Sequence, residues 1–143
     1  MIEKKEIRKM LIRAERARKS VLQPYFAEIG LPLGQGHVRI LESLLTADHI
    51  TQKELADRCH VDVTTMSRSL DRLEEAGFLE RRRDPGNRRS FLVCLTESGV
   101  EEAHKVQEIL AALDERIWKG FDSQEMEQLC QSLERICKNL ESQ

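Results

Sequence analysis

The stretch that decides the fold is "TQKELADRCHVDVTTMSRSLDRLEEAGFLERRRDPGNRRSFLVCLTESG", residues 51–99. Thr51 and Glu54 have the spacing of a capping box, so a helix is predicted to start at Thr51 and to end around residues 59–60. Asp62 is suited to cap a second helix only a few residues later. Two short helices this close together in the sequence predict a helix-turn-helix.

The second of these helices, which Gly77 is expected to close, has an apolar side and a polar side. Met66, Leu70 and Leu73 recur at helical spacing and are predicted to face the core. The opposite side offers hydroxyl and guanidinium groups, which can contact base edges and phosphates in a major groove. Its residues are Thr64, Thr65, Ser67, Arg68, Asp71 and Arg72. The alternative is an ordinary helical hairpin with a solvated polar face.

A basic hairpin is predicted directly after the second helix. Residues 78–83 and 88–96 alternate as short strands around "DPGN", where Pro85 and Gly86 fit the central positions of a type II turn. A narrow minor groove has enhanced negative potential and attracts inserted arginine, whereas a plain charged turn needs no partner. The arginines near the tip are Arg83, Arg88 and Arg89. Their position beside a helix-turn-helix favours a winged helix that binds nucleic acid.

Helices are also predicted on both sides of this region. Residues 3–29 and 96–121 have the pattern of long helices, residues 37–47 form a shorter one after the break at 30–36, and a last helix begins near residue 122. The terminal helices have more apolar surface than the small middle domain could cover. A second copy of the chain would cover it, and an intramolecular core is the alternative.

The expected fold class is therefore mainly α (α+β), a winged helix-turn-helix lobe with N- and C-terminal dimerisation helices. Residues 34–98 would form the DNA-binding lobe, and residues 1–30 and 100–143 would form the dimerisation helices of a single 143-residue chain. A twofold dimer would present its two recognition helices to successive major grooves, about 34–36 Å apart.

Composition and charge support this interpretation. The net charge is only −2, but residues 1–19 hold eight basic and three acidic residues, and five arginines lie in residues 80–89. A local basic patch of this kind suits a polyanionic partner. The sequence has no apolar run of bilayer length and no signal peptide, so we expect a cytoplasmic protein. It also has no nucleophile elbow, HExxH or P-loop, so we expect no enzyme and no cofactor.

The combined motif resembles the core of the MarR family of transcription regulators. The likeness runs through the helix-turn-helix, "LDRLEEAGFLERR", the wing and "LTESG", and extends to the order and length of the flanking helices. It implies a dimeric repressor or activator on a pseudo-palindromic operator, which a small ligand or an oxidant releases. The resemblance places recognition-helix contacts on Thr64, Thr65, Ser67, Arg68 and Arg72.

The resemblance also assigns roles in the wing. Arg89 would be the minor-groove arginine of the segment from Asn87 to Arg89. Asn87 stands where the family pattern has aspartate, and an amide cannot supply a carboxylate to pin an arginine. A winged helix that contacts only proteins is the rival function, although such a wing would not need five arginines.

Three kinds of regulatory site are suggested by the resemblance. An organic effector would bind among Tyr25, Phe26, His37 and Trp118, each of which could instead be plain core. A zinc site would need ligands spaced one helical turn apart, and only His104 and Glu108 have this spacing. The favoured interpretation is that the histidines are ordinary surface or core residues, so no metal site is predicted.

The four cysteines form no CxxC pair, and none lies in the N-terminal helix where the oxidant-sensing branch has its reactive thiol. Cys59, beside His60, is the thiol expected to be most exposed, and Cys94 is expected to be inert within a strand. Cys130 and Cys137 are expected to pack in an apolar face, with a redox role between subunits as the alternative.

Overall fold

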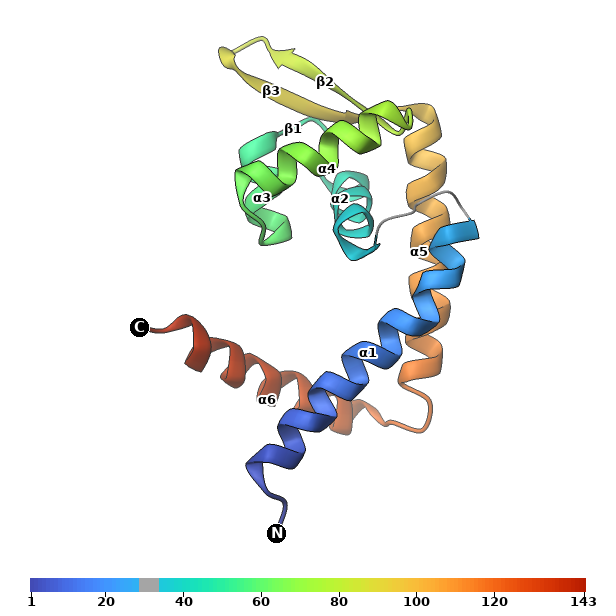
Figure 1. Cartoon of the computed structure of the whole chain (residues 1–143), viewed down its shortest axis with the longest axis vertical. Helices are drawn as coiled ribbons and strands as arrows, with labels where there is room; N and C mark the ends of the chain where they lie inside the picture. The colour runs from blue at the N-terminus through green and yellow to red at the C-terminus, as the bar shows by residue number, and fades with distance from the viewer. Residues whose placement is uncertain (29–33) are drawn as a thin grey trace. The chain divides into compact units, whose positions relative to one another are not determined.

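The computed structural model describes residues 1–28 and 34–143 and divides into two compact units, Met1–Ile109 and Leu110–Gln143. Figure 1 traces the helices and strands of these described residues. In chain order they are α1 (Lys4–Glu28), α2 (Gly34–Thr46), β1 (Ile50–Thr51), α3 (Gln52–Cys59), α4 (Val63–Glu75), β2 (Leu79–Asp84), β3 (Asn87–Leu95), α5 (Glu97–Ile117) and α6 (Ser123–Glu141). The predicted mainly α fold class with a winged helix-turn-helix is confirmed, and the dimerisation role of the terminal helices stays a prediction.

The core of the first unit lies where α2, α3 and α4 meet. Its apolar side chains come from the inward side of each helix, and the small Ala56 lets α3 approach its neighbours closely. The fully or almost fully buried members are Ile40, Leu41, Leu44, Leu55, Ala56, Met66, Leu70 and Leu73. The predicted inward side of α4 is therefore confirmed, and its opposite side is left for solvent or a partner.

The helix boundaries follow from local capping chemistry. The Thr51 hydroxyl accepts the N–H of Glu54 at 3.1 Å, which fixes the start of α3. His60 ends α3 in the left-handed conformation, and Gly77 ends α4 with a φ of +85°. At α6, Asp122 and Glu125 form a reciprocal capping box. The predicted ends of these helices are confirmed to within about two residues.

The sheet has the order β1–β3–β2 and is antiparallel throughout. β2 and β3 form the wing, with Leu79 opposite Leu95 at its base and Arg83 opposite Phe91 towards its tip. β1 was not predicted from the sequence, because two residues are too short for a recognisable alternating pattern. It pairs with the end of β3 next to the helical core, through Ile50 and Val93.

Two predictions about the connections are wrong. The wing tip is not a type II turn, because Gly86 lacks the positive φ that this turn requires at its third position. Instead the Gly86 N–H donates to Asp84 Oδ1 at 2.9 Å, and the β2–β3 register shifts between Arg83 and Asp84. The predicted break at 30–36 does not extend over residues 34–36, which form the first turn of α2; residues 30–33 lie outside the described part of the chain.

The flanking helices retain exposed apolar side chains. In α1, only Leu22 and Phe26 are buried, whereas no residue of α6 is. The apolar residues of α6 that remain exposed are Met126, Leu129, Leu133, Ile136 and Leu140. A search of the described residues found no helix long and apolar enough to cross a membrane.

Candidate nucleic-acid interface

The candidate interface begins at the N-terminus of α4, where Asp62 organises the first turn. Its Oδ1 accepts the Thr65 N–H at 2.7 Å, and its Oδ2 accepts the Thr65 hydroxyl at 3.0 Å. These hydrogen bonds lower the pKa of Asp62, with the Thr65 N–H as the largest cause. The Thr65 hydroxyl already donates its hydrogen to Asp62. Thr65 can therefore offer a partner its oxygen, as an acceptor, and its methyl group.

The outward side of α4 carries the predicted polar residues. Thr64, Thr65, Arg68 and Arg72 are exposed, and Ser67 is half-buried. Arg68 and Arg72 are one helical turn apart, so their guanidinium groups lie on the same side of the helix. This arrangement presents two cations and two threonines on a single exposed surface, which we call the α4 surface.

Arg81 connects the wing to α4. Its guanidinium Nη2 lies 3.0 Å from Glu74 Oε1 and also pairs with Asp71, and both carboxylates belong to α4. The Arg81 backbone N–H donates to the other oxygen of Glu74 at 3.1 Å. Arg81 therefore stabilises the wing and does not contribute a free charge to its surface. The sequence spacing could not predict this pairing, because the contact depends on the turn after α4.

The wing tip is held by hydrogen bonds of its own. Asn87 Oδ1 accepts the Arg89 N–H at 3.0 Å, so the amide stabilises the turn locally without a carboxylate. Arg83 Nη1 donates to the carbonyl of Arg88 at 3.2 Å, and its guanidinium lies 5.6 Å from the centre of the Phe91 ring. Arg83 thus braces the tip, while Arg88 and Arg89 project from it.

Charge pairing separates the arginines of this region into two groups. Arg81 and Arg82 are paired with carboxylates, the latter with Glu80. Within residues 1–28 and 34–143, no ion pair involves the other arginines of the α4 surface and the wing tip. These are Arg68, Arg72, Arg83, Arg88 and Arg89. Their positive charge is available to a polyanion.

The four residues predicted to bind an effector have different environments. Phe26 and His37 are buried, and Tyr25 is exposed. Burial, followed by the charge of Arg72, lowers the pKa of His37. Trp118 belongs to the second unit, where its ring meets Phe121 edge to face at 5.6 Å. Tyr25 and Phe26 are neighbours in sequence, but the side chain of Tyr25 is exposed and that of Phe26 is buried.

The expectations for two sets of cysteines are wrong for the single chain. Cys59 is buried, since its Sγ lies 3.8 Å from Ser43 Oγ of α2, and burial raises the pKa of its thiol. Cys130 and Cys137 are exposed on α6. Cys94 lies in β3, the strand predicted for it, and is buried. The sequence suggested exposure of Cys59 from its place at a helix end, but that end packs on α2.

His104 and Glu108 are both exposed on α5. Among the described residues, the only group of three side chains that could hold a metal ion does not include His104 or Glu108. These two residues therefore have no third metal ligand beside them in the described part of the chain. The expectation of surface histidine is supported for His104.

Comparisons with known proteins agree with this geometry. The MarR family model matches residues 33–91, which contain α2, the helix-turn-helix and most of the wing. The uncharacterized HTH-type transcriptional regulator YybA of Bacillus subtilis (strain 168) is 31% identical over 128 residues, which cover 88% of this chain and 83% of YybA. Against two other curated relatives, the chain spans about two thirds of their length, 66% and 64%.

Solved structures share the fold over nearly the whole chain. The crystal structure of the transcriptional regulator SlyA has a TM-score of 0.83 and 28% identity, covering 94% of this chain and 93% of SlyA. A mutant MarR from E. coli, solved in complex with operator DNA, has a TM-score of 0.80 at 23% identity and covers 92% and 93% of the two chains. From the family model, YybA and the shared architecture together, this chain belongs to the MarR family of transcriptional regulators.

Proposed function

We propose that the chain is a sequence-specific DNA-binding repressor of transcription that acts in the cytoplasm as a homodimer on a pseudo-palindromic operator. The observation that carries this proposal is the set of arginines without carboxylate partners, on the α4 surface and at the wing tip. α4 buries one side in the core and leaves the other, cationic side open. The likeness to a MarR solved with operator DNA supports the same arrangement.

In this proposal α4 enters the major groove. Arg68 and Arg72 would bond to base edges or phosphates, and Thr64, Thr65 and Ser67 would add hydroxyl and methyl contacts. Because the Asp62 carboxylate caps α4 from its own N-terminus, it places a negative charge where a phosphate would otherwise sit. We therefore expect the phosphate contacts of α4 to come from its arginines rather than from its first turn.

The wing would lie along the adjacent minor groove. Arg89 would insert into the groove and Arg88 would contact phosphate, since both leave the tip without an ion-pair partner among the described residues. Arg83 would act mainly by holding the Arg88 carbonyl, with any contact to DNA secondary to that role.

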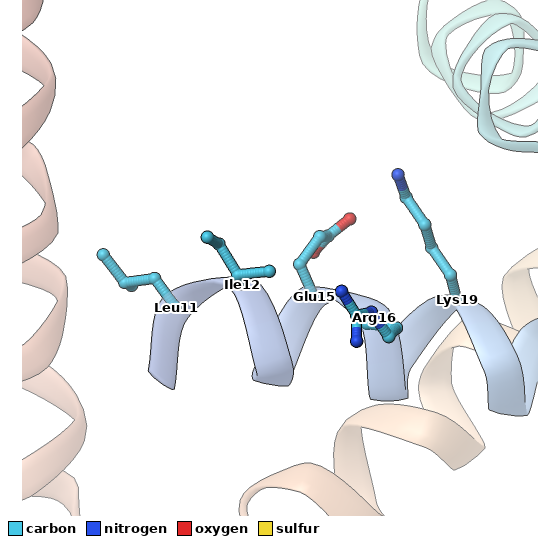
Figure 2. A pocket seen from close by; sticks show the side chains of 5 residues that line it. All are labelled: Leu11, Ile12, Glu15, Arg16 and Lys19. Carbon is cyan, nitrogen blue, oxygen red and sulfur yellow. The ribbon is translucent and has the colours of Figure 1, made fainter. Parts of the chain in front are cut away.

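A second copy of the chain is the proposed partner of α1 and α6. The apolar stripe of α6 is exposed along its whole length. On α1, Figure 2 shows Leu11 and Ile12 extending from the helix beside Glu15, Arg16 and Lys19, and these five residues line an open hollow on one side of the helix. An open apolar surface edged with charge suits another helix better than an enclosed small ligand.

We also propose that a small organic ligand releases the DNA. Phe26 and His37 are both buried, and we expect them to contact the ligand. Tyr25, which belongs to the same unit, completes the proposed site, and ligand binding would favour a dimer whose two α4 helices no longer match successive major grooves.

Titration of the full chain with labelled duplex DNA across a salt series tests the function. Each phosphate neutralised by a DNA-binding surface releases counterions, so log affinity should fall linearly with log salt, by about 0.9 per phosphate contact. Selection from a random duplex pool should return an inverted repeat with half-sites one helical turn apart. The absence of binding to every duplex at low salt would contradict the proposal and favour a winged helix used for protein contacts.

A further inference from the structure

A cluster of three potential metal ligands lies at the base of the wing, away from the α4 surface. One carboxylate oxygen of Asp48, one ring nitrogen of His49 and the Sγ of Cys94 all lie within 4.8 Å of one another. Asp48 and His49 precede β1, and Cys94 lies near the end of β3. The α2–β1 connection and the returning strand of the wing thus bring together residues that are far apart in sequence.

One backbone hydrogen bond and one bond to a side chain hold this loop against β3 on both sides of Cys94. The His49 N–H donates to the Val93 carbonyl at 3.1 Å, and the Leu95 N–H donates to Asp48 Oδ1 at 3.0 Å. The neighbouring Ile50 pairs with Val93 in the sheet. These contacts hold the three residues close together, so that side-chain rotation can bring their ligand atoms onto an ion.

The ligand atoms of the three side chains lie close together. Asp48 Oδ1 accepts two backbone N–H groups, one of them from His49 at 2.9 Å, while Oδ2 lies 3.5 Å from His49 Nδ1. Asp48 and His49 are exposed, whereas Cys94 is buried and its Sγ donates to the Leu92 carbonyl at 3.9 Å. An ion could reach this place from solvent and meet a thiol at its inner end.

His49 has a backbone conformation that is uncommon for a residue other than glycine. Its φ is +61°, in the left-handed region, which costs an L-residue with a Cβ more than it costs glycine. The capping role that explains the same conformation at His60 does not apply to His49, which lies between a helix and a strand. Strain of this kind often marks a functional position.

The chemistry of the donors favours zinc. A thiolate, an imidazole and a carboxylate are the three types of ligand that Zn²⁺ takes in proteins, and three protein ligands leave a fourth position for water. Zinc bonds of ordinary length would require the ligand atoms to lie roughly 3.3–3.6 Å apart. The charged side chains near Cys94 besides Asp48 are Glu80 and Arg82, and these two pair with each other. A deprotonated Cys94 and Asp48 would then balance the charge of the ion.

We propose that Asp48, His49 and Cys94 form a Zn²⁺ site that joins the α2–β1 connection to the base of the wing. The site is independent of the proposed contacts with DNA, because none of its residues belongs to the α4 surface or the wing tip. It also revises the expectation that Cys94 is inert: its burial keeps the thiol from bulk solvent but leaves it next to two exposed ligands.

Co²⁺ is the probe for the first test, because cobalt bound to thiolate gives a charge-transfer band in the near ultraviolet. The full chain carries Cys130→Ala and Cys137→Ala, so that the exposed thiols of α6 cannot contribute. We expect one Co²⁺ per chain with a thiolate band, and displacement of Co²⁺ by Zn²⁺. The Cys94→Ala variant should lose the band, and Asp48→Asn should bind at least tenfold more weakly.

His49→Gly and His60→Gly form a matched pair of variants. Neither changes a core residue, so neither should prevent the chain from folding. Both residues are exposed and have a positive φ, so glycine should keep or raise the midpoint of thermal unfolding of the metal-free chain in each variant. Only His49→Gly should lose tenfold or more in affinity for Co²⁺ and Zn²⁺. A chain without the thiolate band, or equal affinities in the His49→Gly and His60→Gly variants, would overturn the proposal.

Discussion

Arg81 of β2 and Glu74 of α4 are joined twice, through both oxygens of one carboxylate. Glu74 Oε1 lies 3.0 Å from the Arg81 guanidinium, and Glu74 Oε2 accepts the Arg81 backbone N–H at 3.1 Å. A single side chain of α4 thus binds both the backbone and the side chain of Arg81 in the first wing strand. The α4 surface and the wing are therefore held in one geometry before any DNA is bound.

Replacement of Arg81 by Met should destabilise the first unit. The variant keeps most of the apolar stem and removes the pairing with Glu74 and Asp71, which leaves a half-buried carboxylate without its cation. Because both carboxylates are partly exposed and screened by solvent, we expect a loss of about 1–2 kcal/mol in the free energy of unfolding, measured in urea.

Arg82→Met is the matched control for this change. Arg82 pairs with Glu80, but both side chains are largely exposed, so the loss should stay below roughly 0.5 kcal/mol. Equal losses in the Arg81→Met and Arg82→Met variants would show that Arg81 does not hold the wing.

Gly99 is expected to tolerate no side chain. A Cβ at this position of α5 would lie 1.7 Å from the carbonyl oxygen of Phe78, which accepts the Thr96 N–H at 3.1 Å. The obstacle is backbone, so Gly99→Ala should cost about 1–3 kcal/mol or more in the free energy of unfolding.

Gly36→Ala in α2 is the corresponding control, because nothing lies within 4 Å of its Cβ. Alanine favours the helix there by up to about 1 kcal/mol. The free energy of unfolding, measured by chemical denaturation, should therefore fall for Gly99→Ala and rise for Gly36→Ala. A Gly99→Ala variant with unchanged stability would contradict the close contact with Phe78.

The Asp62 cap predicts a pH dependence of stability. Its pKa is lowered in the folded chain, so the ionised cap contributes stability that is fully present above the ordinary Asp pKa of about 3.9. That contribution is lost as the pH falls from this value through the lower folded pKa. Asp62→Asn keeps an oxygen acceptor for the Thr65 N–H but cannot ionise, so its stability should respond less to acid.

Urea unfolding of wild type and Asp62→Asn between about pH 5 and pH 2.5 measures this difference. Asp57→Asn, at an exposed position in α3, controls for the general loss of negative charge. The stability advantage of wild type over Asp62→Asn should shrink with acid. An advantage that stays constant over this range would rule out ionisation of Asp62 as its source.

The parts of the fold that depend on neighbours in sequence were predictable. The Thr51 and Asp62 caps each span three residues, so their residue types alone identify the starts of α3 and α4. The arginine-rich hairpin was equally visible, because both strands and their turn are contiguous. The role of Asn87 at the wing tip also depends on a residue only two positions away.

Features that depend on tertiary contact were not predictable. Cys59 is buried because the end of α3 packs on Ser43, sixteen residues earlier, and Arg39 donates to its carbonyl. Nothing in the local pattern distinguishes Arg81, which is paired, from Arg88, which is not. Likewise, the approach of His49 to Cys94 requires β1, a strand too short to recognise in the sequence.

Arg89→Ala should weaken DNA binding more than the loss of a charge elsewhere. Removal of a side chain inserted in the minor groove should cost about 1–3 kcal/mol, or roughly tenfold to a hundredfold in affinity, and lower the salt slope by about one. Arg135→Ala removes the same charge from the exposed helix α6, which belongs to neither the wing nor the α4 surface, and should leave affinity almost unchanged. Fluorescence anisotropy with one duplex at several salt concentrations measures both effects, and equal affinities for the two variants would refute the wing assignment.

Leu133→Arg should abolish the proposed dimer. Leu133 lies in the middle of the exposed apolar stripe of α6, so a charge there would be buried without a partner when two copies meet. Gln131 lies outside the stripe on the same helix, and Gln131→Arg adds the same charge as a control. Sedimentation should show a dimer for wild type and Gln131→Arg and a monomer for Leu133→Arg. The monomer should still bind a single half-site weakly, because α4 and the wing are folded within one chain; a Leu133→Arg protein that remained dimeric would exclude the α6 stripe from the interface.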